Sequence, residues 1–63
     1  MKDEVQIKRD GNFFTVIVNG WLLFNRDYIG YDSDEDIIDK VYQDIYDELK
    51  ITEEQFNQQF III

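Results

Sequence analysis

The chain has 63 residues, with 14 acidic side chains against six basic ones and a formal net charge of −8. It contains no Cys and no His, which excludes disulfides, thiol chemistry and the common zinc sites. No apolar run reaches the roughly 18 residues of a membrane span, and "MKDEVQIKRD" does not resemble a signal peptide. We therefore expect one cytoplasmic domain over residues 1–63, with no membrane partner.

Residues 4–26 predict a three-stranded antiparallel β-meander. Two dipeptides, Asp10-Gly11 and Asn19-Gly20, are typical of two-residue hairpin turns because both tolerate positive φ angles. The segments around them, "EVQIK", "NFFTVIV" and "WLLFN", are rich in strand-forming residues. Centring the turns on these dipeptides pairs Ile7 with Phe14 and Val16 with Leu23.

This register assigns every side chain to one face of the sheet, since neighbours along a strand alternate. The predicted core face holds Val5, Ile7, Phe14, Val16, Val18, Trp21 and Leu23. The opposite face carries a second apolar group, which we predict to be an oligomer interface: Phe13, Ile17, Leu22 and Phe24. A homodimer is the commonest symmetric outcome, and the alternative is that the C-terminal segment folds over part of this face.

Residues 33–50 predict a long acidic helix that begins at Ser33, a good N-cap residue. Apolar residues recur at helical spacing from Ile37 to Leu49 and form one half of the helix, with Asp39, Asp44 and Asp47 assigned to the other. Residues 52–63 contain a capping box, "TEEQ", that predicts a short second helix. The apolar end "FIII" should pack on the sheet or on a partner, and it is compatible with a further strand. The expected fold class is α+β.

Catalytic and metal signatures are missing. Without His, the only Ser, Ser33, has no base to activate it, and the three glycines form no phosphate-binding loop, so we expect no enzyme and no cofactor. Asp32, Asp34 and Asp36 match the first ligand positions of an EF-hand loop. However, Ile37 stands where the loop needs Gly and Gln43 where it needs Glu. We predict no specific metal site, and loose binding of divalent cations is the open alternative.

Acidic residues are concentrated between residues 31 and 50. Residues 1–26 have three acids and four bases (+1), whereas residues 27–63 have eleven acids and two bases (−9), which sums to −8. Acids in the first helical turn stabilise the helix by interacting with the positive end of its dipole. Lys40 is spaced to pair with Asp36 and Asp44. Solubility is one explanation for the remainder. The other is partner binding, for which the candidates are Asp32, Asp34, Glu35, Asp36, Asp39, Asp44, Asp47 and Glu48.

A helix studded with carboxylates presents negative charge over a length comparable to a short piece of DNA, which would attract a basic DNA-binding protein. The same charge disfavours direct nucleic-acid binding. In its size, charge and strands-then-acidic-helix order, the chain resembles the small acidic proteins of bacteriophages that act as DNA mimics. The resemblance implies an inhibitor of a host nucleoid protein such as HU, a restriction enzyme or a CRISPR nuclease. The alternative is an assembly protein that dimerises through its apolar sheet face.

Overall fold

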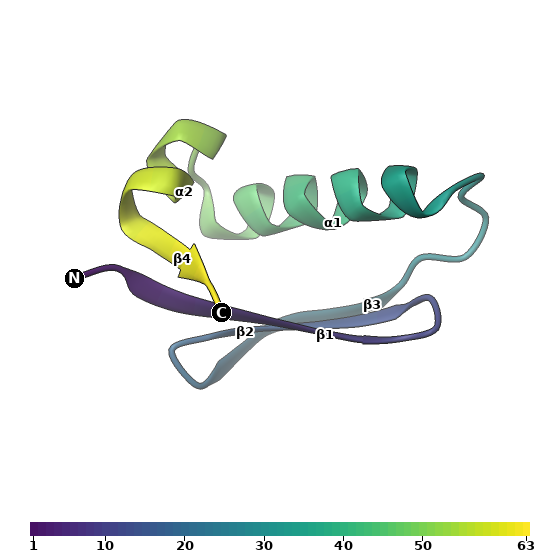
Figure 1. The fold of residues 1–63 in the computed structure, drawn as a ribbon, viewed down its shortest axis with the longest axis horizontal. Helices are drawn as coiled ribbons and strands as arrows, with labels where there is room; N and C mark the ends of the chain where they lie inside the picture. Colours follow the sequence, from purple (N-terminus) through teal and green to yellow (C-terminus); the bar gives the residue numbers. More distant parts are fainter.

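A computed structural model describes residues 1–63 as four strands and two helices. The strands are β1 (Asp3–Asp10), β2 (Phe13–Val18), β3 (Trp21–Asp27) and β4 (Phe60–Ile62), and the helices are α1 (Asp34–Leu49) and α2 (Glu53–Gln59). Both helices lie on the same side of the sheet (Figure 1). The predicted α+β fold is confirmed: a three-stranded meander is followed by a long helix and a short one. No helix has the length and apolar character needed to cross a membrane.

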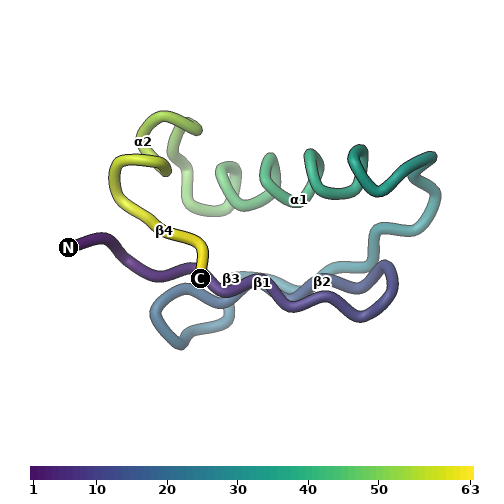
Figure 2. Tube along the Cα trace, viewed as in Figure 1, coloured from purple at the N-terminus to yellow at the C-terminus, as the bar shows by residue number.

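The C-terminal residues complete the sheet. The strand order is β3-β2-β1-β4, in which β1 pairs antiparallel with β2 and parallel with β4. The pairs Asp3↔Phe60 and Val5↔Ile62 place the last residues beside the first strand, as Figure 2 shows. The apolar end predicted to pack on the sheet therefore extends it as a fourth strand.

The two hairpin turns follow the prediction to different degrees. At Asn19-Gly20 both residues have positive φ, 49° and 83°, and Val18 pairs with Trp21 as expected. The first turn is displaced by one residue, because Asp10 pairs with Phe13 and the loop is Gly11-Asn12. Ile7 consequently faces Val16 instead of Phe14. A shift of two residues leaves each side chain on its predicted face, so this error does not affect the core.

A β-bulge in the second hairpin does change the faces. The register between β2 and β3 shifts after the Ile17↔Leu22 pair, so that Val16 faces Phe24 rather than Leu23. Phe24 therefore turns into the core, where it is 7% exposed, and its predicted place in an oligomer interface is wrong. Trp21 was predicted to be a core residue but is 80% exposed. It borders the β2–β3 turn, which curves away from both helices in Figure 1.

Side chains define the helix ends largely as the sequence predicts. Ser33 accepts a hydrogen bond from the Asp36 backbone N–H at 3.3 Å, and Lys50, in the left-handed conformation (φ 58°), caps the C-terminal end of α1 after Leu49. At the start of α2, Thr52 and Gln55 form the complete capping box. These caps satisfy backbone groups that the helix ends leave unpaired.

The hydrophobic core lies between the sheet and the helices. It contains residues from β1, β2, β3, the connection to α1, and both helices: Val5, Phe14, Val16, Phe24, Tyr28, Ile37, Val41, Ile45 and Phe56. Aromatic contacts link its parts, including an edge-to-face pair of Phe14 and Tyr28 at 5.6 Å between ring centroids. Three further residues of the predicted core face, Ile7, Val18 and Leu23, are partly buried against this cluster.

Candidate protein-binding surface

Asp44 is the one buried charged residue of the chain, with 5% of its surface exposed. Its carboxylate accepts hydrogen bonds from the Tyr28 hydroxyl at 2.7 Å and from Lys40 Nζ at 2.8 Å, and it lies 3.1 Å from Arg26 Nη1. The helical spacing of the sequence assigns Asp44 to the solvent side and to partner binding. That assignment is wrong, because the carboxylate points toward the sheet and its oxygens are occupied.

Arg26 joins β3 to the inner side of α1. Its guanidinium contacts Asp44 through one nitrogen and Glu48 through the other, and it lies over the Phe24 ring at 4.6 Å from the centroid. A guanidinium that bridges two carboxylates and packs on an aromatic ring is held in a defined orientation. Glu48, another predicted partner-binding residue, is thus paired within the chain. We call Asp44 and Glu48 the inner acidic pair.

The bulge in β3 explains why Arg26 reaches the helix. Without the shift in register, Phe24 and Arg26 would both lie on the outer face of the sheet. With it, Arg26 pairs with Phe14 and Phe24 with Val16, which puts both side chains on the face covered by α1. This inner ion-pair network was not predicted from the sequence. One signal was available, since Asp44 follows Ile37 by seven residues and Val41 by three, so it lies on the apolar side of the helix.

The network shifts the ionisation of its members. Burial raises the pKa of Asp44, but hydrogen bonds from Lys40, Tyr28 and Arg26 outweigh this effect, so that the pKa lies below the ordinary value of 3.8. Burial and the hydrogen bond to Asp44 raise the pKa of Tyr28, which stays protonated and donates. Hydrogen bonds to Glu48 and Asp44 raise the pKa of Arg26. Asp44 is therefore a charged structural residue at neutral pH.

The remaining candidates divide into one paired residue and five free ones. Asp34 forms an ion pair with Arg9 of β1 at 2.8 Å, which ties the start of α1 to the sheet. Asp32 precedes the helix, is exposed and has no ion-pair partner. On α1, four exposed acids have no ion-pair partner either, and we call them the outer acidic row: Glu35, Asp36, Asp39 and Asp47.

The residues of the outer acidic row are exposed along the length of α1. Twelve residue steps from Glu35 to Asp47 give it a length of about 18 Å at 1.5 Å per residue. One strand of duplex DNA carries about five phosphates over that length of axis, and both strands together carry about ten. Four carboxylates therefore approach the charge density of a single strand, and they fall well short of the whole duplex.

The carboxylates at the start of α1 do not form a metal centre. Asp34 is engaged by Arg9, and Asp36 is an outer-row residue whose backbone N–H bonds the Ser33 cap. No group of three or more acidic side chains in the chain lies close enough together to hold a metal ion.

The outer face of the sheet has less apolar surface than the sequence predicts. Phe24 is buried on the opposite face, and Phe13 is flanked across the sheet by Asp10 and Asp27. Ile17 and Leu22 remain as a directly paired couple, and Leu22 is 59% exposed. Of the four predicted interface residues, two form a contiguous apolar contact and a third stands apart from them.

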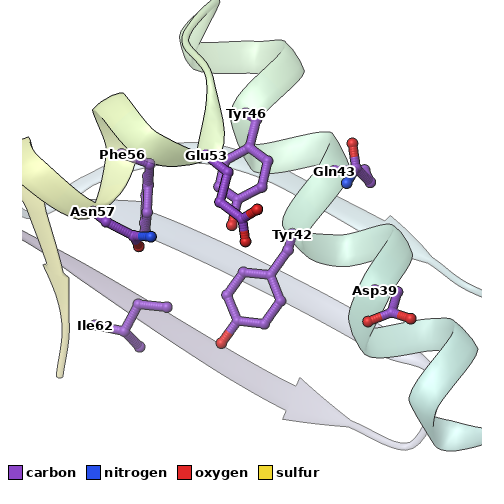
Figure 3. Close-up of a pocket in the computed structure, with 8 residues that line it drawn as sticks. All are labelled: Asp39, Tyr42, Gln43, Tyr46, Glu53, Phe56, Asn57 and Ile62. Carbon is purple, nitrogen blue, oxygen red and sulfur yellow. The ribbon is translucent and has the colours of Figure 1, made fainter.

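A groove of about 450 Å³ lies between α1, α2 and β4. Figure 3 shows the rings of Tyr42 and Tyr46 extending from α1 into it, with the Glu53 carboxylate and the Asn57 carboxamide reaching it from α2. The two tyrosine rings stack at 6.4 Å between centroids, and Phe56 packs on Tyr46 at 5.3 Å. Asp39 of the outer acidic row also borders the groove, which joins the two features into one surface.

The fold and this surface define a small α+β protein with an acidic, aromatic-bordered helix face. In comparisons with known proteins, no family model, curated protein or solved structure matches the chain.

Proposed function

We propose that the protein is a non-enzymatic inhibitor that binds a basic DNA-binding protein of a bacterial host by presenting DNA-like negative charge from α1. The observation that carries this proposal is the outer acidic row, four exposed carboxylates without ion-pair partners over about 18 Å of helix. Nucleoid proteins, restriction enzymes and CRISPR nucleases are the partners that the resemblance to phage DNA mimics implies, and the cytoplasm is where they would be met.

Within α1, the layout of charge separates acids that are paired from acids that are free. Three bases are engaged by Asp34, Asp44 and Glu48, which face the sheet or its edge. The acids left free are therefore those turned toward solvent. A basic groove would be steered toward this side at a rate that falls with ionic strength, because screening shortens the range of the field.

Capture from a bacterial lysate tests the proposal. The immobilised protein should retain a DNA-binding protein at about 50 mM salt and release it at about 500 mM, where the Debye length is only a few ångströms. Duplex DNA added at low salt should displace the captured protein. The double variant Asp39→Lys/Asp47→Lys should lose capture, since it reverses charge in the middle and at the end of the outer acidic row.

The matched control moves the same charge elsewhere. Each Asp→Lys or Glu→Lys exchange adds two charges, so Glu4→Lys/Asp10→Lys and Asp39→Lys/Asp47→Lys both take the net charge from −8 to −4. Glu4 and Asp10 are exposed on β1 and form no ion pair. If both double variants lost capture equally, the net charge alone would explain the loss. That result would refute a specific acidic face. Capture that DNA does not compete for would refute mimicry.

Assembly through the outer sheet face is a second candidate function. It is favoured by the Leu22 side chain, which is 59% exposed and lies beside Ile17 on this face. Light scattering at tens of micromolar tests it: a dimer that Leu22→Lys converts to a monomer would support assembly, whereas a monomeric wild-type protein would refute it.

A further inference from the structure

From the groove between α1 and α2 we infer a binding site for one arginine side chain of the partner protein, with its guanidinium against Tyr42 and Tyr46 and its charge opposite Glu53 and Asp39. The inference rests on the proposed function and specifies the recognition chemistry at one point of the same surface. It is drawn from the shape of the groove and from the chemistry of the residues that line it.

The aromatic wall suits a flat cation. Tyr42 and Tyr46 are nearly parallel, with 24° between their planes, and both border the groove. Cations bind the face of an aromatic ring within about 6 Å of its centroid, and the planar guanidinium also stacks. Phe56 fixes one side of Tyr46 in an edge-to-face contact, so this ring is held in place before a ligand arrives.

The polar groups of the groove are free to accept hydrogen bonds. Tyr28 is the only tyrosine whose hydroxyl is hydrogen-bonded within the chain, through Asp44. The hydroxyls of Tyr42 and Tyr46 must therefore be accessible to solvent, since no buried polar side-chain atom lacks a partner. Glu53 has no ion-pair partner. A guanidinium has five N–H donors in a fixed arrangement. The side-chain oxygens of Tyr42, Tyr46 and Glu53 accept no hydrogen bond within the chain, whereas the Asn57 backbone carbonyl accepts one from Lys2 Nζ at 2.8 Å.

The electrostatics of the groove favour a cation. Burial raises the pKa of Tyr46, and the nearby negative charge of Glu53 raises it further. Asp39 adds a second carboxylate at the α1 side, and the one basic group beside the groove, Lys2 Nζ, is bonded to the backbone carbonyl of Asn57. A neutral apolar ligand would leave Glu53 desolvated without a counter-charge, which is unfavourable. Arginine supplies the charge and a flat surface together, whereas lysine supplies the charge alone.

The probe is N-acetyl-arginine amide, titrated into the ¹⁵N-labelled protein and followed by amide chemical shifts. We expect saturable shifts centred on Tyr42, Tyr46, Glu53 and Asn57. N-acetyl-citrulline amide, the neutral isostere, should produce no saturable shift, and N-acetyl-lysine amide should bind about two- to fivefold more weakly, because it lacks the planar stacking group.

Two neighbouring residues provide a matched pair of variants. Glu53→Gln and Glu54→Gln each remove one charge from the first turn of α2, but only Glu53 lines the groove. Glu53→Gln should weaken binding of the arginine probe by about two- to fivefold, the range for a partly exposed ion pair, while Glu54→Gln leaves it within the error of the titration. Tyr42→Phe keeps the ring and should retain the preference for arginine over lysine.

Several results would overturn the inference. For the variants, the contradicting result would be equal weakening of arginine-probe binding by Glu53→Gln and Glu54→Gln. For the probes, it would be chemical-shift changes spread over all exposed acids, an affinity for the lysine probe equal to that for the arginine probe, or saturable binding of the citrulline probe at the groove. The inference and the proposed function fail separately. Capture that depends on Asp39 and Asp47 without arginine binding would refute the groove site alone. Arginine binding without capture of any DNA-binding protein would refute the inhibitor function.

Discussion

The two sides of α1 carry acids of the same kind in opposite circumstances. On the inner side, Asp44 and Glu48 meet Arg26, and Asp44 also meets Lys40 and Tyr28. On the outer side, the four carboxylates of the outer acidic row have no ion-pair partner. A count of acids along a helix therefore combines residues with two different roles. Inner acids join the helix to the sheet, and only outer acids are available to another molecule.

The variant that should change stability the most is one that removes the buried carboxylate. Asp44→Ala leaves the Tyr28 hydroxyl without its acceptor and Arg26 without one of its two carboxylates, so we expect the free energy of unfolding to fall by about 3 kcal/mol. Urea denaturation measures the change. Asp39→Ala on the outer side should stay within about 0.5 kcal/mol of the wild type. Similar losses in both variants would show that the two sides do not differ energetically.

Removing the cation tests the same network from the sheet. Arg26→Gln keeps a polar side chain but loses the charge that faces Asp44 and Glu48, and we expect a loss of about 1–2 kcal/mol in urea denaturation. Asp44 retains Lys40 and Tyr28, so the effect should be smaller than that of Asp44→Ala. Lys8→Gln is the control, since Lys8 is exposed and forms no ion pair. An unchanged stability in Arg26→Gln would contradict the bridging role.

Acid should weaken the inner side selectively. The pKa of Asp44 is lower in the folded state than its ordinary value of 3.8, so its contribution is complete above that value and is lost as the pH falls through the folded-state pKa. The difference in unfolding free energy between wild type and Asp44→Asn should therefore be constant near neutral pH and shrink below pH 3.8. A difference that grows on acidification would mean that the folded-state pKa is raised instead.

The smallest expected effect has the opposite sign. The last turn of α1 contains no basic residue, and Asp47 there lies at the negative end of the helix dipole. Asp47→Lys should raise the free energy of unfolding by about 0.3–1 kcal/mol. Asp36→Lys, in the first turn of α1, should lower it, because the first turn favours acids. Thermal denaturation at low salt compares the two. Destabilisation by Asp47→Lys would indicate a structural role that the contacts do not show.

Local sequence signals predicted most of the fold. Two features depend only on residues close in the sequence: the capping box of Thr52 and Gln55, and the Asn19-Gly20 turn. The structure confirms both. The bulge in β3 was not predictable in this way. Its strand begins "WLLF", in which apolar residues occupy both alternations, so the hydrophobic pattern fits either register. Errors in the placement of Phe24 and Arg26 follow from that one ambiguity.

The exposure of the candidate acids was predicted in part. Five of the eight proposed acids are exposed without ion-pair partners, while Asp34, Asp44 and Glu48 are paired. Helical geometry alone could have excluded Asp44 from the partner-binding candidates, because Asp44 follows Ile37 by two turns and therefore lies on the same side of the helix. The groove could not have been found from sequence, because it requires α2 to pack beside α1 and β4 to pair with β1.

The parallel pairing of β4 with β1 has a consequence for the order of folding. The β1–β2 and β2–β3 hairpins close loops of two residues, but Asp3 and Phe60 are separated by almost the whole chain. Closing so long a segment costs more chain entropy and yields only a three-residue strand. We therefore expect β4 to form last in refolding and to exchange its amide hydrogens first in the native state. Ile62 lines the groove, so departure of this strand would remove one of its walls.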